Sequence, residues 1–383
     1  MGLQMEFKVN SKELEKLLSK LYPAVPSRSP ISQLENFLME IKDGKLTAYA
    51  SDLEVALKAS LNIVSEENIK FAIPAKLIYD MVRTFSDTTI HFQFLDNGKI
   101  NVSTDKGKYK ISYLDADEYP ELPSFSTDDV ENIEKFSING LDLKYIFDKT
   151  YFALSKDEVR PAMNGVFFQM SEEGLKNVAT DGHRLVYINK KNAEFSYNAE
   201  FIVPERAVSI LMKGLDDSEV TLYFKKESNS TVSFVLNDVE LVTRLIDKKY
   251  PDYRAVIPAE NDNMLKINLK ELQDAIKRMM LFTTSSNTRR VKLSISNNNL
   301  EISAEDVDKG ASGTENVTCE YSGEPMDIGF NSVYLNEVLS HMQSENDILF
   351  KLYNPTKAAI LEPEKKKDNF DLLMLLMPVR LNN

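Results

Sequence analysis

The chain has 383 residues, more than a single hydrophobic core usually organises, so two or three domains are expected. It carries 59 acidic and 46 basic residues, a net charge of −13 that argues against simple phosphate binding, and its single cysteine, Cys319, excludes an intrachain disulfide and a cysteine-based metal cluster. Because no apolar run approaches the roughly 18 residues that span a bilayer, no membrane partner and a cytoplasmic location are expected.

The first predicted helix recurs three times at one constant interval along the chain. A short alternating apolar segment begins at the evenly spaced Phe7, Phe136 and Leu265, and each segment ends in an asparagine at a helix N-cap position. An acidic residue follows three positions later, as in a capping box, and apolar residues then recur at the i, i+3 and i+4 spacing of one buried stripe. These predicted helices cover 11–21, 140–150 and 269–279.

A second helix is predicted later in each copy, opening at Pro74, Pro204 and Asn331. Proline suits the start of a helix because its missing N–H has no partner there. Apolar residues follow the i, i+3, i+4, i+7 spacing in all three. These helices cover 75–85, 205–215 and 332–342, and the alternating or β-branched runs around them predict antiparallel strands.

A third repeated landmark, Tyr119-Pro120 and Tyr250-Pro251, marks two domain exits that are separated by almost the same interval. The sequence therefore predicts an α+β protein of three repeated domains, each with two helices packed on antiparallel sheets of roughly eight strands. The predicted domains are 1–130, 131–260 and 261–383. Unrelated α/β domains with coincidental spacing are the alternative, and three landmarks at nearly one interval favour the repeat.

The usual signatures of nucleotide, dinucleotide and zinc chemistry are missing from the sequence, so no catalytic residue, cofactor or metal is predicted. The only histidine beside a carboxylate in a compact motif is His183, in Thr180-Asp181-Gly182-His183-Arg184. A hydrolase would use Asp181 to orient His183 as a general base. Neighbouring residues seldom reach that geometry, and Asp52 occupies the matching place of the first repeat without a histidine, so a turn or binding role is favoured.

Four motifs together resemble the β subunit of bacterial DNA polymerase III, the family of replicative sliding clamps. They are Arg160-Pro161-Ala-Met-Asn-Gly165-Val166, the segment Val178-Ala-Thr-Asp-Gly-His-Arg-Leu185, Tyr250-Pro-Asp-Tyr253 and the terminal Met377-Pro-Val-Arg-Leu381. Their order and spacing match the family, and with the repeat the resemblance covers about residues 5 to 381. The Ala-Thr-Asp-Gly-His-Arg-Leu segment is the most specific of them.

The resemblance implies a head-to-tail dimeric ring of three clamp domains per subunit, closed around double-stranded DNA. Such a ring slides without sequence specificity and confers processivity without catalysis of its own. Polymerase and 3′–5′ exonuclease activities then belong to partner subunits. The implied partners are a second copy of this chain, the replicative polymerase catalytic subunit, an ATP-dependent clamp loader and other proteins with a clamp-binding motif.

The resemblance also assigns residues to the ring and to DNA. Tyr109 and Ile111 match one side of the family's dimer interface, and Leu281 and Phe282 match the other. Arg28 and Arg83 match DNA-contacting positions. Helix position alone adds Arg206, Lys277 and Arg278.

The predicted helices offer an answer to the acidity of the chain. The six helical windows hold 12 basic and 9 acidic residues, a charge of +3, whereas the rest of the chain carries −16. Helices that face inward would line a mildly basic channel suited to sequence-independent phosphate contact. An alternative explanation of these charges is the helix dipole, because acidic residues begin these helices and lysine or arginine ends most of them.

The family's pocket for a linear apolar peptide maps onto two separate segments of this chain and their neighbours. The implied pocket residues are Met163, Thr180, Gly182, His183, Arg184, Leu185, Pro251, Val256, Leu375, Met377, Pro378, Val379 and Arg380. Leucine, methionine and valine suit an adaptable apolar surface, and Arg184 and Arg380 are expected to orient the polar ends of the peptide. A buried final strand is the alternative for 372–377.

Two departures from the family pattern affect these expectations. Pro161 and Ala162 replace a tyrosine pair that precedes the pocket in some members, which removes an expected DNA contact, and Ala255 replaces an arginine. A hydrolase using His183 and a peptide-binding scaffold without a DNA function stay open as alternatives. Retention on circular DNA distinguishes a clamp from both of them.

Limited proteolysis is expected to cut near 125–132 and 255–264, because domain connections carry few contacts and are exposed. Mass spectrometry of the fragments identifies the sites. Protease-resistant fragments that cross both junctions, with cuts only inside the repeats, would contradict the predicted domains.

Overall fold

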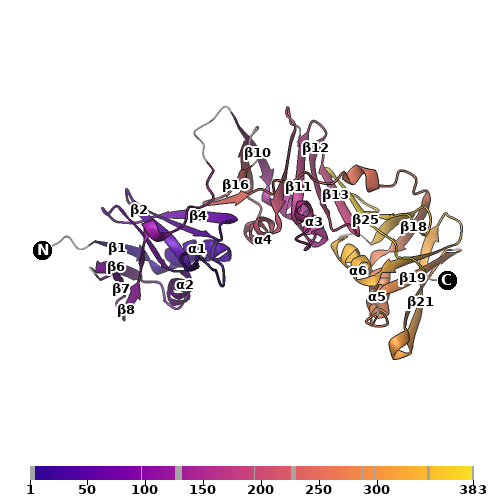
Figure 1. The fold of residues 1–383 in the computed structure, drawn as a ribbon, viewed down its shortest axis with the longest axis horizontal. Helices are drawn as coiled ribbons and strands as arrows, with labels where there is room; N and C mark the ends of the chain where they lie inside the picture. Colours follow the sequence, from indigo (N-terminus) through magenta and orange to yellow (C-terminus); the bar gives the residue numbers. More distant parts are fainter. Residues whose placement is uncertain are drawn as a thin grey trace. The chain divides into compact units, whose positions relative to one another are not determined.

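The computed structural model describes residues 5–95, 97–125, 132–193, 195–225, 230–285, 288–296, 298–342 and 346–381 (Figure 1). The predicted boundary between 130 and 131 lies outside these residues, as do residues 1–4, for which no structural role is predicted. No helix in the described ranges combines the length and the apolarity needed to cross a bilayer.

Six α-helices lie in the described part of the chain, two in each repeat, at the predicted positions. They are α1 Ser11–Leu21, α2 Ala75–Arg83, α3 Gly140–Thr150, α4 Glu205–Gly214, α5 Leu269–Met280 and α6 Ser332–His341. The Asn10 side chain accepts from the amides of Lys12 and Glu13, and Asn268 accepts from the amide of Glu271. These bonds confirm the predicted N-caps, since they satisfy amides that have no partner within the helix.

The chain divides into two compact units, and the division passes through the middle repeat. One unit runs up to Lys144 and includes Arg206–Leu245; the other comprises Tyr145–Glu205 and the residues from Ile246 onward. The prediction of three repeats with two helices and antiparallel strands is confirmed, whereas the exact boundaries at 130 and 260 stay a prediction. The middle repeat is divided because its strands pair with both neighbouring repeats.

The first unit contains a four-stranded and a nine-stranded sheet, both antiparallel. The smaller sheet has the order β1 Glu6–Asn10, β6 Thr89–Leu95, β7 Lys99–Ser103 and β8 Lys108–Ser112. The larger sheet has the order β10 Ile133–Asn139, β15 Glu219–Lys225, β16 Thr231–Leu236, β17 Val239–Arg244, β4 Val55–Asn62, β3 Lys45–Ser51, β2 Asn36–Lys42, β5 Ile69–Pro74 and β9 Leu114–Asp115. Strands of the first and second repeats therefore share one sheet.

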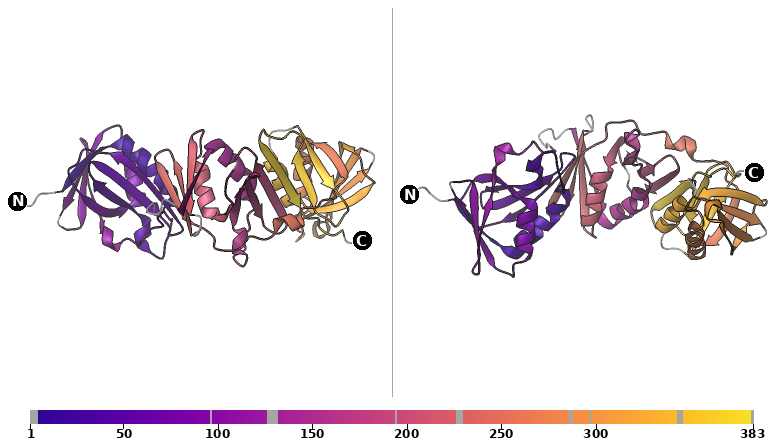
Figure 2. Two further views of the ribbon diagram at one scale, coloured as in Figure 1. Left: turned by 90° about the horizontal axis from the view of Figure 1, so that it is seen from above. Right: turned by 60° about the horizontal axis from the view of Figure 1, so that its bottom comes forward.

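The second unit contains an antiparallel sheet of twelve strands. Their order is β14 Ala199–Pro204, β11 Gly165–Ser171, β12 Gly174–Thr180, β13 Arg184–Lys190, β25 Phe370–Leu376, β24 Ala359–Pro363, β23 Asp347–Leu352, β18 Asn263–Asn268, β21 Ala311–Tyr321, β20 Asn299–Asp306, β19 Arg290–Ser296 and β22 Met326–Asn331. The β25 strand near the C-terminus lies beside β13 of the middle repeat (Figures 1 and 2).

Equivalent strands join the repeats in both units. The third strand after the first helix of a repeat pairs with the last strand of the next repeat, as β4 with β17 and β13 with β25. In the first pair Ala56 lies opposite Val242, and in the second Leu185 lies opposite Leu375. Segments that are far apart in the sequence are thus neighbours in one sheet, with apolar cross-strand pairs between them.

Gly165→Ala is expected to lower the melting temperature, because a Cβ at this position would overlap the carbonyl oxygen of Val203 on the neighbouring strand. Overpacking of this kind costs about 1–3 kcal/mol. Gly214→Ala is the matched control, since a Cβ there meets open space at the end of α4. Thermal unfolding followed by circular dichroism compares the two. An equal effect of both substitutions would contradict the register of β11 and β14.

Candidate functional site

A tight turn between β12 and β13 organises the candidate site. The Thr180 hydroxyl donates to the Arg184 carbonyl at 2.7 Å and accepts from the Gly182 amide at 3.1 Å. Asp181 Oδ1 accepts from the amides of His183 and Arg184 at 2.9 and 3.0 Å. Gly182 has a φ of +88°, a left-handed conformation in which glycine carries no Cβ strain. These five residues therefore hold a fixed shape at the end of the strand.

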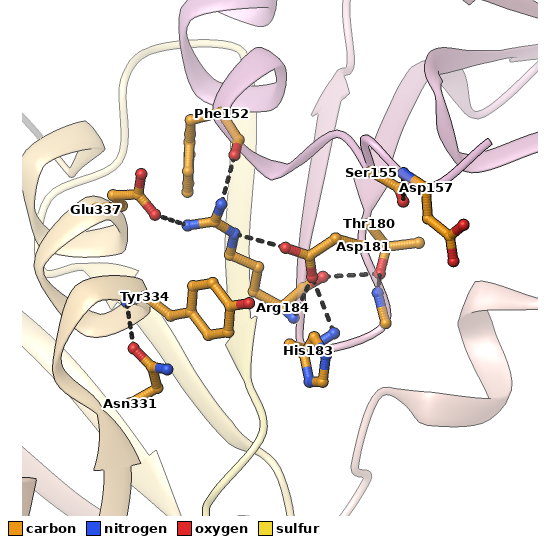
Figure 3. A network of polar contacts seen from close by, with 11 residues as sticks. Phe152, Ser155, Asp157, Thr180, Asp181, His183, Arg184, Asn331, Tyr334 and Glu337 are labelled. Atoms are coloured by element: carbon orange, nitrogen blue, oxygen red, sulfur yellow. Dashed lines mark hydrogen bonds and ion pairs between the residues drawn. The ribbon is translucent and has the colours of Figure 1, made fainter. Parts of the chain in front are cut away.

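The guanidinium of Arg184 is enclosed within the protein, with only 7% of the residue exposed. Its Nε donates to Asp181 Oδ2 at 3.1 Å, one Nη donates to Glu337 of α6, and the other donates to the Phe152 carbonyl at 2.7 Å (Figure 3). The Phe152 and Tyr334 rings lie 5.1 and 4.8 Å from the guanidinium carbon. Arg184 therefore joins the turn to α6, and its expected contact with the polar end of a peptide stays a prediction.

The same contacts contradict the hydrolase alternative. The Asp181 carboxylate receives backbone amides and the Arg184 side chain, and the His183 imidazole instead stacks on Tyr334 at 5.5 Å (Figure 3). A general base in a triad needs its ring nitrogen bonded to the orienting carboxylate. Asp181 thus has a structural role as the acceptor at the centre of the turn.

An apolar cluster lies beside the turn, on the sheet formed by the second and third repeats. Its buried members are Phe167, Val178, Leu185, Ile202, Tyr250, Tyr253, Ala358 and Leu375. The stacked rings of Phe167 and Tyr250, 4.5 Å apart, lie within it. The β13–β25 pairing brings Leu185 and Leu375 together, as the resemblance implied.

The tyrosines of the cluster act as apolar walls with one hydrogen-bonding end. The Tyr250 hydroxyl donates to the Val178 carbonyl at 3.4 Å, and the Tyr253 hydroxyl donates to Gln169 Oε1 at 3.0 Å. Burial raises the pKa of the Tyr250 phenol well above its usual range, and burial is also the main reason that the pKa of Tyr187 rises to about 12. Both phenols therefore stay neutral at physiological pH.

Two apolar side chains that closely follow cluster residues in the chain are exposed. Val256, in the 3₁₀ turn Tyr253–Val256, is 51% exposed, and Met377, directly after β25, is 40% exposed. The Met377 amide donates to the His183 carbonyl at 2.8 Å, which fixes the strand end against the turn. By contrast Leu185 and Leu375 are each only 2% exposed. The two leucines form the floor of the candidate site, and Val256 and Met377 offer a surface to a ligand.

The remaining predicted pocket residues separate into two groups. Met163 and Pro251 are half-buried and lie next to Ala162 and Tyr250 of the cluster in the chain, and their place in a pocket stays a prediction. The C-terminal segment instead lies against β22, where the Val379 amide donates to the Gly329 carbonyl at 2.8 Å. The Arg380 side chain lines a different cavity, of about 620 Å³, together with Arg290.

The predicted DNA-contacting residues differ in how free their charges are. Arg28, Arg83 and Lys277 are exposed. Arg206 instead donates from Nε to Asp52 at 2.7 Å and from Nη to the Pro23 carbonyl at 2.8 Å, and Arg278 is paired with Glu315 of β21. Arg206 therefore has a structural role within its own unit, and its use for DNA requires that the Asp52 contact be given up.

The residues assigned to the dimer interface lie on two accessible elements. Tyr109 is exposed on β8, the outermost strand of its sheet, whereas the Ile111 side chain is buried in the core and can contribute only backbone contacts. Leu281 is 69% exposed after α5. The Phe282 ring lies against Gly313 of β21, close enough that a Cβ at this glycine would meet it at 2.9 Å.

Several residues of the site were not predicted. Phe152, Tyr334 and Glu337, which surround Arg184, come from segments that carry no motif. Phe167, Ile202 and Ala358 of the cluster look like ordinary core residues in the sequence. Tyr250 and Tyr253 had a usable signal, since both belong to the Tyr-Pro-Asp-Tyr motif.

Comparison with protein families matches three successive models to this chain. The N-terminal, central and C-terminal domains of the DNA polymerase III beta subunit match residues 5–123, 137–252 and 254–380. Among curated relatives, the beta sliding clamp of Synechococcus elongatus is 32% identical, covering 99% of this chain and 100% of that protein. The beta sliding clamp of Escherichia coli K12 is 29% identical, covering 89% and 92%.

Solved structures show the same relationship. The DNA polymerase III subunit beta of Pseudomonas aeruginosa matches with a TM-score of 0.90 and 26% identity, covering 98% of this chain and 100% of that one. The beta subunit of Thermotoga maritima matches with a TM-score of 0.86 and 28% identity, covering 99% and 100%.

Arg184→Ala is expected to lower the free energy of unfolding by about 3–5 kcal/mol, because it leaves the Asp181 carboxylate, whose side chain is only 14% exposed, and the Phe152 carbonyl without the guanidinium donor. Arg160→Ala is the control, since its side chain is 55% exposed and its ion-pair distance to Asp157 is 3.6 Å. Chemical denaturation measures both. A change below about 0.5 kcal/mol for Arg184→Ala, the range of ordinary surface substitutions, would contradict the role of this network.

Proposed function

The chain belongs to the DNA polymerase III beta subunit family, and we propose that two copies of it close head to tail into a ring around double-stranded DNA. Its function is that of a sliding clamp: it raises the processivity of a DNA polymerase and has no catalytic role of its own. The observation that carries the ring proposal is the repeated strand pairing between successive repeats.

Two strands of the types that pair in this way have no partner from another repeat among the described residues: one in the first repeat and one in the third. β4 pairs with β17 and β13 pairs with β25, so the next pair in the series joins β21 of the third repeat to β8 of a first repeat. A second copy of the chain supplies that first repeat. Because the two surfaces differ and the contact is made twice, the assembly closes as a finite ring with twofold symmetry.

The two strands have the properties that such a junction needs. Among the described residues, β8 pairs only with β7, and residues 311–318 of β21 pair only with β20. The free edge of β8 carries the exposed Lys108, Tyr109 and Lys110. Exposed edges with unpaired backbone groups favour strand addition.

Contact with DNA is proposed for the basic residues of the helices and their neighbouring loops. Arg28, Arg83 and Lys277 are exposed and suited to phosphates, and Arg206 and Arg278 are secondary candidates because carboxylates already neutralise them. Contacts to phosphates carry no sequence information, which suits a protein that must slide. Because the rest of the chain is acidic and repels phosphates, a ring of this protein would stay on DNA by enclosing it more than by binding it tightly.

The exposed Val256 and Met377, above the floor of Leu185 and Leu375, are proposed to bind the apolar linear motif of the polymerase catalytic subunit and of other partners. A floor that is already packed means that the peptide meets a preformed surface. Preformed surfaces bind with less loss of conformational entropy. An ATP-dependent loader is proposed to open the ring, and the site of action is the cytoplasm.

The protein is expected to stay on a circular DNA after loading and to leave once that circle is cut. Ordinary non-specific affinity, with a Kd on the order of 10⁻⁴ to 10⁻⁶ M, permits dissociation at any time, whereas a closed ring leaves only by opening or at an end. Gel filtration of nicked circles before and after linearisation measures retention. Equal retention on circles and on linear fragments with free ends would refute encirclement.

Met377→Ala is expected to weaken binding of a labelled C-terminal polymerase peptide at least about tenfold, because truncating an apolar anchor typically costs about 2 kcal/mol. The melting temperature should change little, since the side chain is exposed. Leu185→Ala should weaken binding too, but as a buried residue it should also lose about 2–5 kcal/mol of stability. Fluorescence anisotropy and thermal melts separate the two effects. Unchanged peptide affinity in both dimeric variants would place the pocket elsewhere.

A further inference from the structure

The turn that organises the candidate site has a counterpart at the matching place of the first repeat, between β3 and β4. There the Ser51 hydroxyl donates to the Val55 carbonyl at 2.7 Å and accepts from the Leu53 amide at 3.0 Å. Asp52 Oδ1 accepts from the amides of Glu54 and Val55 at 3.1 and 2.9 Å. These four bonds repeat, position by position, the bonds of the turn at 180–184. The two turns therefore have one shape.

An arginine completes each turn. Arg184 Nε donates to Asp181 at 3.1 Å, and Arg206 Nε donates to Asp52 at 2.7 Å. The two arginines come from different places in the sequence, one within the turn and the other at the start of α4. The aspartate of each turn is thus paired with an arginine, but the two arginines come from different elements. The shared feature is therefore the turn itself.

The strand that follows each turn is joined to the next repeat in the same way. The Met377 amide donates to the His183 carbonyl at 2.8 Å, and the Arg244 amide donates to the Glu54 carbonyl at 3.0 Å. We call the β4–β17 pairing, with its turn, the first junction and the β13–β25 pairing, with its turn, the second junction. Arg244 and Met377 therefore occupy matching positions at the first and second junctions. One junction presents a thioether there, and the other presents a charged guanidinium.

Each junction also has an apolar cluster of matching origin. Beside the first turn, the buried members are Leu34, Leu38, Ala72 and Tyr119. Leu38 matches Phe167 in the alignment of the two repeats, and Tyr119 matches Tyr250 in the repeated Tyr-Pro landmark. The first junction thus contains counterparts of cluster residues that the middle repeat supplies, while Ala56 and Val242 lie opposite each other in place of Leu185 and Leu375.

The two junctions differ at the left-handed position of the turn. Gly182 has a φ of +88°, and Leu53 has a φ of +74° at the matching place. A leucine in this conformation costs roughly 1–2 kcal/mol relative to the right-handed region, so its presence needs a compensating interaction. The Leu53 side chain packs against the cluster of Leu34, Leu38, Ala72 and Tyr119. Burial of that side chain supplies the compensation.

We infer that the two junctions are quasi-equivalent peptide sites, one open and one closed, and that residues 182 and 53 with the strand-end residues 377 and 244 decide which is open. The inference rests on the proposed peptide-binding function of the second junction. At the first junction Leu53 covers this cluster from within the chain, and the charged Arg244 stands where the candidate site has the apolar Met377. Each subunit therefore binds one apolar peptide, although its fold provides two places for one.

The glycine at position 182 of the open site has a role beyond its backbone conformation. The Cβ of a larger residue there would meet only the end of the flexible Arg160 side chain, at 3.1 Å. Space around the Cβ therefore does not demand a glycine, and Leu53 shows that the same turn accepts a leucine at the backbone cost given above. Glycine keeps the floor accessible to a ligand.

Gly182→Leu tests the closing role directly. We expect affinity for the labelled polymerase peptide to fall at least about tenfold, a loss of about 1.4 kcal/mol, with the chain still folded and dimeric. Gly182→Ala should retain most of the affinity, because its methyl group is too short to cover the floor. Gly44→Leu, at another left-handed glycine with a φ of +70°, reports the cost of such a leucine to folding alone. Unchanged affinity in Gly182→Leu, or an equal loss in Gly182→Ala, would overturn the inference.

The reciprocal change tests the closed site. In the double variant Leu53→Gly with Arg244→Met, isothermal titration with the same peptide should show about two sites per chain in place of one, the second weaker than the first. A single site in a folded, dimeric double variant would overturn the inference. Absence of binding to the unmodified protein would instead contradict the proposed peptide-binding function, so the two failures are distinguishable.

Discussion

The pairing of outer strands between successive repeats is the constraint on which the rest of this structure depends. An antiparallel strand at the edge of a sheet exposes backbone N–H and C=O groups that need partners. Here β17 covers β4 and β25 covers β13, so each repeat satisfies an edge of the one before it. This explains why the middle repeat divides between two compact units. Among the described residues, β8 and residues 311–318 of β21 each keep one edge without a strand partner, and these are the edges proposed to join two copies of the chain.

The same pairing creates the candidate site. Leu185 and Leu375 become cross-strand neighbours only because β13 and β25 align in register, and a shift by one residue would turn both side chains to the opposite face. The turn at 180–184 then fixes the register at its end, through the bond from the Met377 amide to the His183 carbonyl. Arg184, held by three acceptors between two rings, joins this turn to α6. A surface for a ligand thus follows from the way that two repeats are held together.

Repetition of a fold does not require repetition of its function, and the two junctions show how little needs to differ. The hydrogen bonds of the turn, the carboxylate neutralised by arginine and the strand-end bond are common to both. Side chains at two positions differ in size and charge. The backbone carries the architecture because its hydrogen bonds are obligatory, whereas the side chains that face solvent are free to diverge.

The sequence by itself determined the three repeats, their six helices, the N-caps and the family resemblance, because these depend on local periodicity and on motifs that do not need distant contacts. The resemblance also predicted one site from the segments around 185 and 377, and the β13–β25 pairing brings these two strands together. Only the tertiary structure decided the roles of Arg184, Arg206 and Ile111. The sequence shows that two of these residues are charged and one is apolar, but it does not show their partners. Arg184 contacts the Glu337 carboxylate, Arg206 contacts the Asp52 carboxylate, and Ile111 is buried in the core. Long-range packing sets those partners, and a single sequence carries no record of them.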